Sequence, residues 1–175
     1  AVGNITSIND NIVGGTNYRT FGYDDLNRMT SATGGFDVNG AYKSCTYIFD
    51  AIGNFTNKCA NIISYTDAMH PSAATMLNST SYAYDANGNM TTRGTQTLVW
   101  DIDNRVISVS IAGGGTTSME YDFTGMRVKK NAPGGITLFP FPGYEIAPNG
   151  EITKYIRIGV ETFASKRGAN KYYYH

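Results

Sequence analysis

The chain has 175 residues, and its 14 Lys and Arg balance its 14 Asp and Glu, so the formal net charge is zero. This length suffices for one domain with a core, and the neutral balance argues against nucleic acid or an anionic membrane as partner. No run of about 18 apolar residues is present, so no membrane span is expected. Frequent Tyr, Phe, Thr, Ile and Gly favour β-structure.

A short unit recurs along the chain: an aromatic residue, Asp, two variable residues, and then Asn or Gly. The opening Gly3-Asn4-Ile5-Thr6 matches the second half of this unit, so we expect the chain to begin inside a repeat. The aromatic-Asp pairs are Tyr23-Asp24, Phe49-Asp50, Tyr84-Asp85, Trp100-Asp101 and Tyr121-Asp122, and their turn residues are Asn27, Gly53, Gly88, Asn104 and Gly125.

Each unit predicts a β-hairpin. Alternating aromatic and β-branched residues lead into the Asp, and Asn87-Gly88 predicts a type I′ turn. The Asp side chain is expected to accept hydrogen bonds from backbone N–H groups two or three residues further on, which closes the turn. The sequence therefore predicts an all-β fold of consecutive antiparallel hairpins.

The interval between the second and third turns holds an additional module around residues 65–75. Pro71 suits the first position of a helix, so a single short helix is predicted over Pro71–Leu77. His70 precedes this proline in a turn and is interpreted as part of a loop, not as a catalytic base.

Strict alternation follows the fourth aspartate of the series. Ile107, Val109 and Ile111 fall on one face of a strand and Ser108 and Ser110 on the other, which predicts one dry and one wet face.

The repeats carry a family resemblance. Tyr84–Thr91, Trp100–Val106 and Tyr121–Lys130 strongly resemble the Rhs/YD-repeat family, and His70-Pro71-Ser72-Ala73 also looks like a recurrent family segment. The tail from Lys171 to His175 resembles the start of the signature that ends the Rhs core. The resemblance extends over essentially the whole chain, and five units in register are highly specific.

The resemblance implies long β-ribbons of consecutive hairpins that form a curved, spiralling sheet and a hollow shell. Such shells enclose a toxin in bacterial toxin systems, and related proteins act at cell surfaces in adhesion and carbohydrate contact. We expect a YD-repeat ribbon over 1–130 and a C-terminal Rhs-core-like segment over 131–175, continuous with the same sheet. The chain stops before the family's Asp-Pro-containing self-cleavage motif, so no catalytic residue carries over.

Cys45 and Cys59 flank the second aromatic-Asp turn symmetrically. If that hairpin is centred on Ile52, Phe49 faces Phe55 and Cys45 faces Cys59, within disulfide reach at a Cα separation of about 4.5 Å. A disulfide fits a secreted protein, whereas two buried free thiols would fit a reducing compartment. Two thiols without a third ligand do not predict a metal site.

Basic and amide residues complete the repeats. Arg28 and Arg105 follow turn asparagines, Arg127 lies one position later in its unit, and Asn54 and Asn89 follow turn glycines. One hypothesis is that each arginine stacks on an aromatic ring and pairs with a repeat Asp of an adjacent hairpin. The alternative is a solvated charge at the end of a strand.

These patterns favour a structural protein that is secreted or on the cell surface, with no catalytic site, metal or cofactor. It would act as the wall of a shell or as the subunit of a self-assembling fibre. Its partners would be further copies, paired edge to edge, or the remainder of a larger Rhs protein. The alternatives are a toxin-encapsulating fragment of a larger Rhs toxin and a module that presents aromatic residues to surface glycans.

Overall fold

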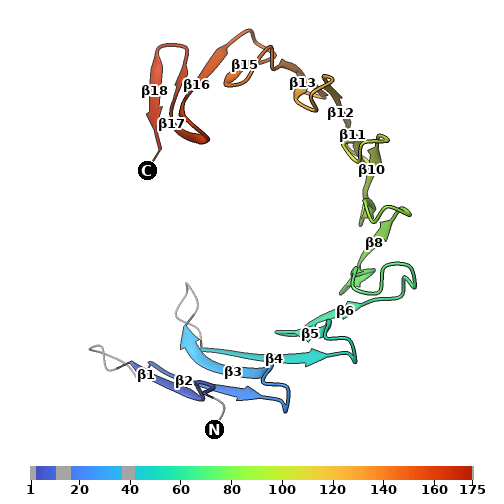
Figure 1. The fold of residues 1–175 in the computed structure, drawn as a ribbon, viewed down its shortest axis with the longest axis vertical. Helices are drawn as coiled ribbons and strands as arrows, with labels where there is room; N and C mark the ends of the chain where they lie inside the picture. The colour runs from blue at the N-terminus through green and yellow to red at the C-terminus, as the bar shows by residue number, and fades with distance from the viewer. Residues whose placement is uncertain (1–2, 11–16, 37–41, 175) are drawn as a thin grey trace. The chain divides into compact units, whose positions relative to one another are not determined.

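The structure, a computed structural model, describes residues 3–10, 17–36 and 42–174. His175, the last residue of the tail that resembles the start of the core-terminal signature, lies outside these ranges. The described chain folds into β-strands and turns, and its registered strand pairs are antiparallel between chain neighbours (Figure 1). The prediction of an all-β chain of consecutive antiparallel hairpins is therefore confirmed. Within these ranges no helix reaches the length and hydropathy needed to cross a membrane.

The chain divides into two compact units, and the first is Ala1–Tyr82. Each of its strands pairs with the strand that follows it, up to β8, which continues past the boundary. The strands are β1 (Ser7–Asp10), β2 (Asn17–Tyr23), β3 (Met29–Phe36), β4 (Tyr42–Phe49), β5 (Phe55–Lys58), β6 (Asn61–Ser64), β7 (Met76–Leu77) and β8 (Thr80–Tyr84).

The second unit is Ala83–His175. Its registered pairs also run in chain order, from β9–β10 to β17–β18. The boundary expected at residues 130 and 131 falls inside one of these strands, β13. The strands are β9 (Met90–Arg93), β10 (Gln96–Trp100), β11 (Val106–Ile111), β12 (Thr116–Tyr121), β13 (Arg127–Ala132), β14 (Gly135–Leu138), β15 (Tyr144–Ile146), β16 (Ile152–Ile158), β17 (Glu161–Arg167) and β18 (Asn170–Tyr173).

The helix predicted over Pro71–Leu77 is wrong. The segment consists of turns that lead into β7, which pairs with β6 and β8. Thr75 shows why: its N–H donates to the Ser64 carbonyl at 2.8 Å, and its carbonyl accepts from the Tyr82 N–H at 2.9 Å. Both backbone groups are therefore engaged by neighbouring segments and are not available for hydrogen bonds within a helix.

Few side chains are buried. Among the described residues only Ala164, Thr153 and Ser165 are buried, and all three belong to the β16–β17 hairpin. The predicted contrast between a dry and a wet face of β11 is wrong, because its residues 106–110 are all half-buried. A sheet with no second layer packed on it among the described residues shields its two faces only by contacts between neighbouring side chains.

Candidate functional site

The repeat turn is the feature that the sequence singles out, and the Asp101 loop shows its geometry. One carboxylate oxygen, Oδ1, accepts hydrogen bonds from the backbone N–H groups of Asp103 and Arg105, both at 2.9 Å. The other oxygen, Oδ2, accepts from Arg105 Nε at 2.8 Å. A single half-buried carboxylate thus holds two backbone amides and one side chain of its own loop.

The same arrangement recurs at the other repeat aspartates. Each Oδ1 accepts from the amides two and four residues further on. The expected hydrogen bond from the amide two residues on is therefore confirmed, whereas the second one comes from the fourth residue and not from the third. Where the residue four positions on is Arg or Asn, its side chain donates to Oδ2. The sets are Asp24 with Leu26 and Arg28, Asp50 with Ile52 and Asn54, Asp85 with Asn87 and Asn89, and Asp122 with Thr124 and Met126.

Backbone hydrogen bonds close each loop over five residues. In the third unit the Asp85 N–H donates to the Asn89 carbonyl at 2.9 Å, and the Gly88 N–H donates to the Asp85 carbonyl at 3.0 Å. Gly88 has a φ of +83°, but Asn87 is not among the positive-φ residues of the described chain. The predicted type I′ turn, which needs positive φ at both positions, is therefore wrong. The longer loop prevails because the carboxylate captures two of its amides.

The turn position of every unit lies in the left-handed region. Glycine reaches this region at no steric cost, and asparagine is the commonest other residue there. The φ values are +61° for Asn27, +96° for Gly53, +83° for Gly88, +58° for Asn104 and +84° for Gly125.

A β-bulge follows the turn in four units. Trp100 faces Val106 and Val99 faces Ser108, so Ile107 is an extra residue on β11. The equivalent extra residues are Thr30, Thr56 and Val128. One inserted residue shifts the register beyond it and increases the local twist.

This bulge alters the expected pairing of the two cysteines. Tyr47 faces Lys58, so Cys59 is the first residue after β5 and lies beside Thr46, whose carbonyl accepts its N–H at 3.0 Å. The prediction that Cys45 faces Cys59 directly is wrong by one residue. The two sulfur atoms are nevertheless bonded in the structure, with the Cα atoms 4.3 Å apart.

The repeat aromatic residue connects its unit to the preceding one. The Tyr121 hydroxyl donates to the Val106 carbonyl at 2.7 Å, and the Trp100 indole Nε1 donates to the Met90 carbonyl at 2.8 Å. In both cases the acceptor lies five residues after the preceding repeat Asp. The Tyr23 hydroxyl likewise donates at 2.9 Å to the carbonyl of Ile5, the equivalent position after Gly3-Asn4.

The arginines make the opposite connection, towards the following aromatic residue. The guanidinium carbon lies 4.4 Å from the Phe49 ring centroid for Arg28 and 5.1 Å from that of Tyr121 for Arg105. Arg127 lies 4.7 Å from the Phe139 centroid. The predicted pairing with a repeat Asp of an adjacent hairpin is wrong, since Arg28 and Arg105 pair with the Asp of their own turn.

Turns also contact one another directly. In the first compact unit of the chain, Asn27 Oδ1 accepts from Asn4 Nδ2 at 2.9 Å. In the second compact unit, Asn104 Oδ1 accepts from Asn87 Nδ2 at 3.1 Å and from Asn89 Nδ2 at 2.7 Å. Such linked repeat turns are present in each of the two compact units, and we call this succession of turns the turn ladder.

The module at residues 65–75 docks on the Asp50 turn. Asn54 Nδ2 donates both to Asp50 Oδ2 and to the Pro71 carbonyl, each at 2.9 Å. His70 Nδ1 lies 2.9 Å from Asp67 Oδ2 and lowers the pKa of that carboxyl. These contacts give His70 and Asp67 a place in the structure of the loop, in agreement with its interpretation as a turn.

One turn of the same shape was not recognised from the sequence. The Ala147 N–H donates to the Glu151 carbonyl and the Gly150 N–H to the Ala147 carbonyl, both at 2.9 Å. Ala147 takes the place of the repeat Asp, and Asn149 Oδ1 accepts the Glu151 amide instead at 3.0 Å. The Asn-Gly pair at 149–150 was the available signal.

The hydrogen bonds stabilise the ionised form of the repeat carboxylates. For Asp24 and Asp101 the amide four residues further on is the main cause of a lowered pKa. For Asp122 the first cause is the hydrogen bond from the Thr124 hydroxyl. Burial alone would raise the pKa of Asp50, but the donors of its loop outweigh it and the net direction is downward.

Comparisons with known proteins place the chain beside much longer ones. No protein-family model matches it. It is 27% identical over 150 residues to the tRNA3(Ser)-specific nuclease WapA of Bacillus spizizenii and 28% identical over 150 residues to the tRNA nuclease WapA of Bacillus subtilis. Each match covers 80% of this chain but only 6% of the relative. These matches support a relationship of the Rhs type.

Two solved structures also resemble the chain at low similarity. One is the Photorhabdus luminescens Tc holotoxin pore with a mutated TccC3, at a TM-score of 0.44 and 17% identity. The other is the TcdB2-TccC3 complex, at a TM-score of 0.42 and 17% identity. Both alignments cover 86% of this chain and 9% of the larger one.

Proposed function

We propose that this chain is a structural, non-catalytic segment of the YD-repeat type and forms part of the wall of a β-sheet shell in a larger protein. The turn ladder carries this proposal. The carboxylates, amides, guanidinium groups and aromatic rings that define the repeat bind one another within and between turns. Their polar groups serve the fold, and they leave little capacity for a substrate.

Exposed apolar side chains support a wall with further protein against it. Ile102 is 96% exposed and Phe123 is 100% exposed, each directly after a repeat Asp. In the proposed wall these side chains would contact further parts of the larger protein, one of the roles that exposed apolar surface has when it forms a patch. The chain also spans only 6% of the length of its WapA relatives, which supports a role as one segment among many.

The disulfide supports a location outside the cytoplasm. Disulfides persist in oxidising compartments and are rare where thiol reductants are abundant. Cys45 and Cys59 are bonded in the structure and close a loop with a sequence separation of 14. We therefore include a secreted or cell-surface location in the proposal.

The relatives are named as tRNA nucleases, and we propose that such an activity resides outside this segment. The five repeat carboxylates accept hydrogen bonds from donors of their own loops, as Asp101 shows. The test is incubation of the purified chain with total tRNA. We expect no cleavage; tRNA cleavage abolished by one substitution in a folded chain would overturn the proposal.

A self-assembling fibre is the second candidate. Within the described residues β18 pairs only with β17, so its other edge is unpaired, and a neutral chain offers little repulsion to further copies. Negative-stain microscopy of the purified chain separates the two candidates. We expect a wall segment to give discrete particles in the micrographs and to bind a hydrophobic dye in a separate assay. Ordered filaments would contradict the wall proposal and favour the fibre.

A further inference from the structure

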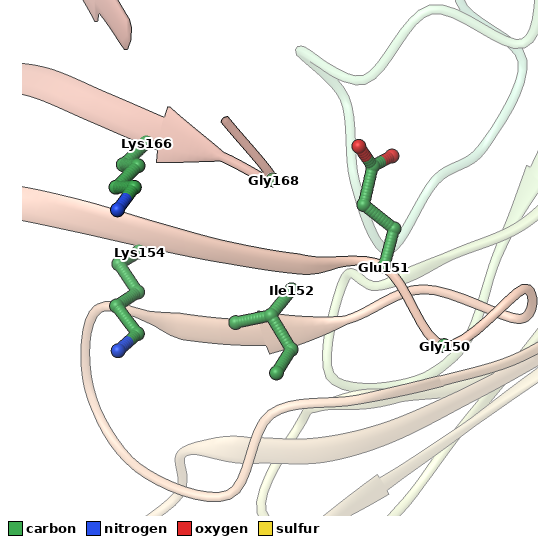
Figure 2. A pocket seen from close by; sticks show the side chains of 6 residues that line it. All are labelled: Gly150, Glu151, Ile152, Lys154, Lys166 and Gly168. Carbon is green, nitrogen blue, oxygen red and sulfur yellow. The ribbon is translucent and has the colours of Figure 1, made fainter. Parts of the chain in front are cut away.

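Three lysines lie directly opposite one another on adjacent strands at the C-terminal end of the second unit. Lys154 of β16 faces Lys166 of β17, and Lys166 faces Lys171 of β18. Directly opposed residues share a face of an antiparallel sheet, with Cβ atoms about 4.5–5.5 Å apart. We call these three residues the lysine row. Figure 2 shows the Lys154 and Lys166 side chains extending side by side in the same direction.

This arrangement is unfavourable in isolation, because like charges directly opposite one another destabilise a sheet. No ion pair between described residues includes a member of the lysine row. The contrast is Lys129, which faces Glu120 across β12 and β13 and pairs with it at 2.8 Å. The same fold therefore offsets a cross-strand lysine with a carboxylate elsewhere but gives the row no carboxylate partner. The Lys154 ammonium lies instead 5.6 Å from the ring centroid of Tyr144, the residue that it faces on β15.

The distribution of charge along the sequence reinforces the contrast. Residues 152–175 hold five of the 14 basic residues and one of the 14 acidic residues, which leaves nine basic and thirteen acidic residues in the rest of the chain. The segment therefore has a local formal charge of +4 in a chain whose total is zero. A local positive field attracts anions even when the net charge of the whole chain is zero.

The row borders an open hollow of about 350 Å³ that is lined by Gly150, Glu151, Ile152, Lys154, Lys166 and Gly168. In Figure 2 the Glu151 carboxylate points away from the two ammonium groups, and no ion pair between described residues joins it to either lysine. The two glycines keep the rim free of side chains, and Ile152 supplies an apolar wall. Space and positive charge are thus available at the same place.

We propose that the lysine row, with this hollow beside it, is a binding site for an oxyanion, the carboxylate or phosphate group of a small ligand. Lys154 and Lys166 would bind it from two adjacent strands, and Lys171 would add its charge from the third. Ammonium groups are compact point charges that bind phosphate and carboxylate without a fixed fork geometry. A bound oxyanion would offset the repulsion between opposed lysines, so binding and the stability of the hairpin are coupled.

The test is a titration of the intact chain with inorganic phosphate, followed by the NMR shifts of its backbone amides at constant ionic strength. We expect saturable shifts confined to β16–β18, with millimolar affinity. Lys166→Met removes the central charge and keeps the aliphatic stem, and it should weaken binding at least tenfold. Lys129→Met, at the paired lysine outside the row, is the matched control and should leave phosphate binding unchanged.

A parallel titration with glucuronate distinguishes the two sources of oxyanion. Saturation by phosphate alone, by glucuronate alone or by both supports the site and identifies the preferred group. Shifts that stay linear with both anions, or that are the same in Lys166→Met as in the unchanged chain, would overturn the proposal. If Lys166→Met does not fold, Lys171→Met provides the same comparison from the last strand.

Discussion

The repeat aspartate determines the conformation of its loop through the hydrogen bonds that its carboxylate accepts. At Asp101 one oxygen binds two amides and the other binds the Arg105 side chain. The turn residue, Asn104 in this loop, then adopts a positive φ of 58°. Asp, turn residue and basic or amide residue form one hydrogen-bonded set, which explains why the three types recur together.

The turn position offers a direct test of this conformational requirement. Gly125 has a φ of +84°, and a Cβ there would meet only Arg105 Nη1, at 3.8 Å, an ordinary contact. Gly125→Ala should therefore lower the free energy of unfolding through backbone strain alone, by about 1 kcal/mol. Gly125→Asn should cost less, because asparagine occupies the same position in two other units. Equal stability of Gly125→Ala and the unchanged chain in urea titration would contradict this interpretation.

The carboxylates also predict how stability depends on pH. The pKa values of Asp24, Asp50, Asp101 and Asp122 are lowered from 3.8 in the folded chain. The contribution of these ionised carboxylates to the free energy of unfolding is therefore fully present above pH 3.8. It is lost as the pH falls through the lowered pKa values. Thermal unfolding should show a plateau above about pH 5 and a steep loss of stability below about pH 4.

Asp101→Asn provides the matched comparison, because the amide oxygen still accepts backbone hydrogen bonds but does not titrate. This variant should be less stable at neutral pH and should lose less stability on acidification. An acid transition as steep as that of the unchanged chain would show that this carboxylate does not contribute to it.

Sequence reasoning at this scale identified the residue types and missed the loop length. The Asp was expected to accept backbone hydrogen bonds, and it does so, but from the amides two and four residues on. The Asn87-Gly88 pair suggested a two-residue type I′ turn because local turn statistics consider backbone preference alone. The competing carboxylate, whose two bonds favour a five-residue loop, lies outside that pair.

At the level of the hairpins, the bulge after the turn sets the register. In the β4–β5 hairpin the extra residue Thr56 moves Cys59 out of the strand and beside Thr46. The proximity of Cys45 and Cys59 could be predicted from their symmetric spacing around the turn, whereas the register could not. A bulge depends on how the aromatic residue and the loop pack against each other, and no single residue type in the repeat predicts it.

The disulfide in this hairpin has a measurable contribution. A bridge that closes a loop of about 15 residues stabilises the folded state by about 3 kcal/mol, through the entropy of the unfolded chain. Reduction, or the double substitution Cys45→Ser with Cys59→Ser, should lower the free energy of unfolding by about that amount. Mass spectrometry of the unreduced chain should find both cysteines bonded. Free thiols there, or a reductant effect on the double variant, would contradict the account.

The links between hairpins can be tested by removing one hydroxyl. Tyr121→Phe deletes the hydrogen bond to the Val106 carbonyl and leaves a ring for Arg105 to stack on. The expected loss is about 1 kcal/mol in the free energy of unfolding. Tyr173→Phe, at a tyrosine that is 70% exposed, is the control and should have almost no effect. Similar losses in both variants would indicate that the hydroxyl link does not stabilise the ladder.

Across the whole molecule, the hydrogen bonds of the turn ladder provide much of the stabilisation that a buried core usually provides. Only three described residues are buried, and large apolar side chains such as Ile102, Phe123 and Val160 are almost fully exposed. The fold class followed from the periodic turns, since each hairpin forms from neighbouring residues. The short helix over Pro71–Leu77 failed because contacts outside the segment determine its conformation, through Ser64 and Tyr82.

Residue-resolved amide hydrogen exchange tests the central claim, that carboxylates hold the loops of the turn ladder. The amides two and four residues after each repeat Asp, such as Asp103 and Arg105, should exchange slowly although they lie outside β-ladders. The amide directly after each Asp, as at Ile102 and Phe123, should exchange quickly in the same loops. Equally fast exchange at all loop positions would contradict the account.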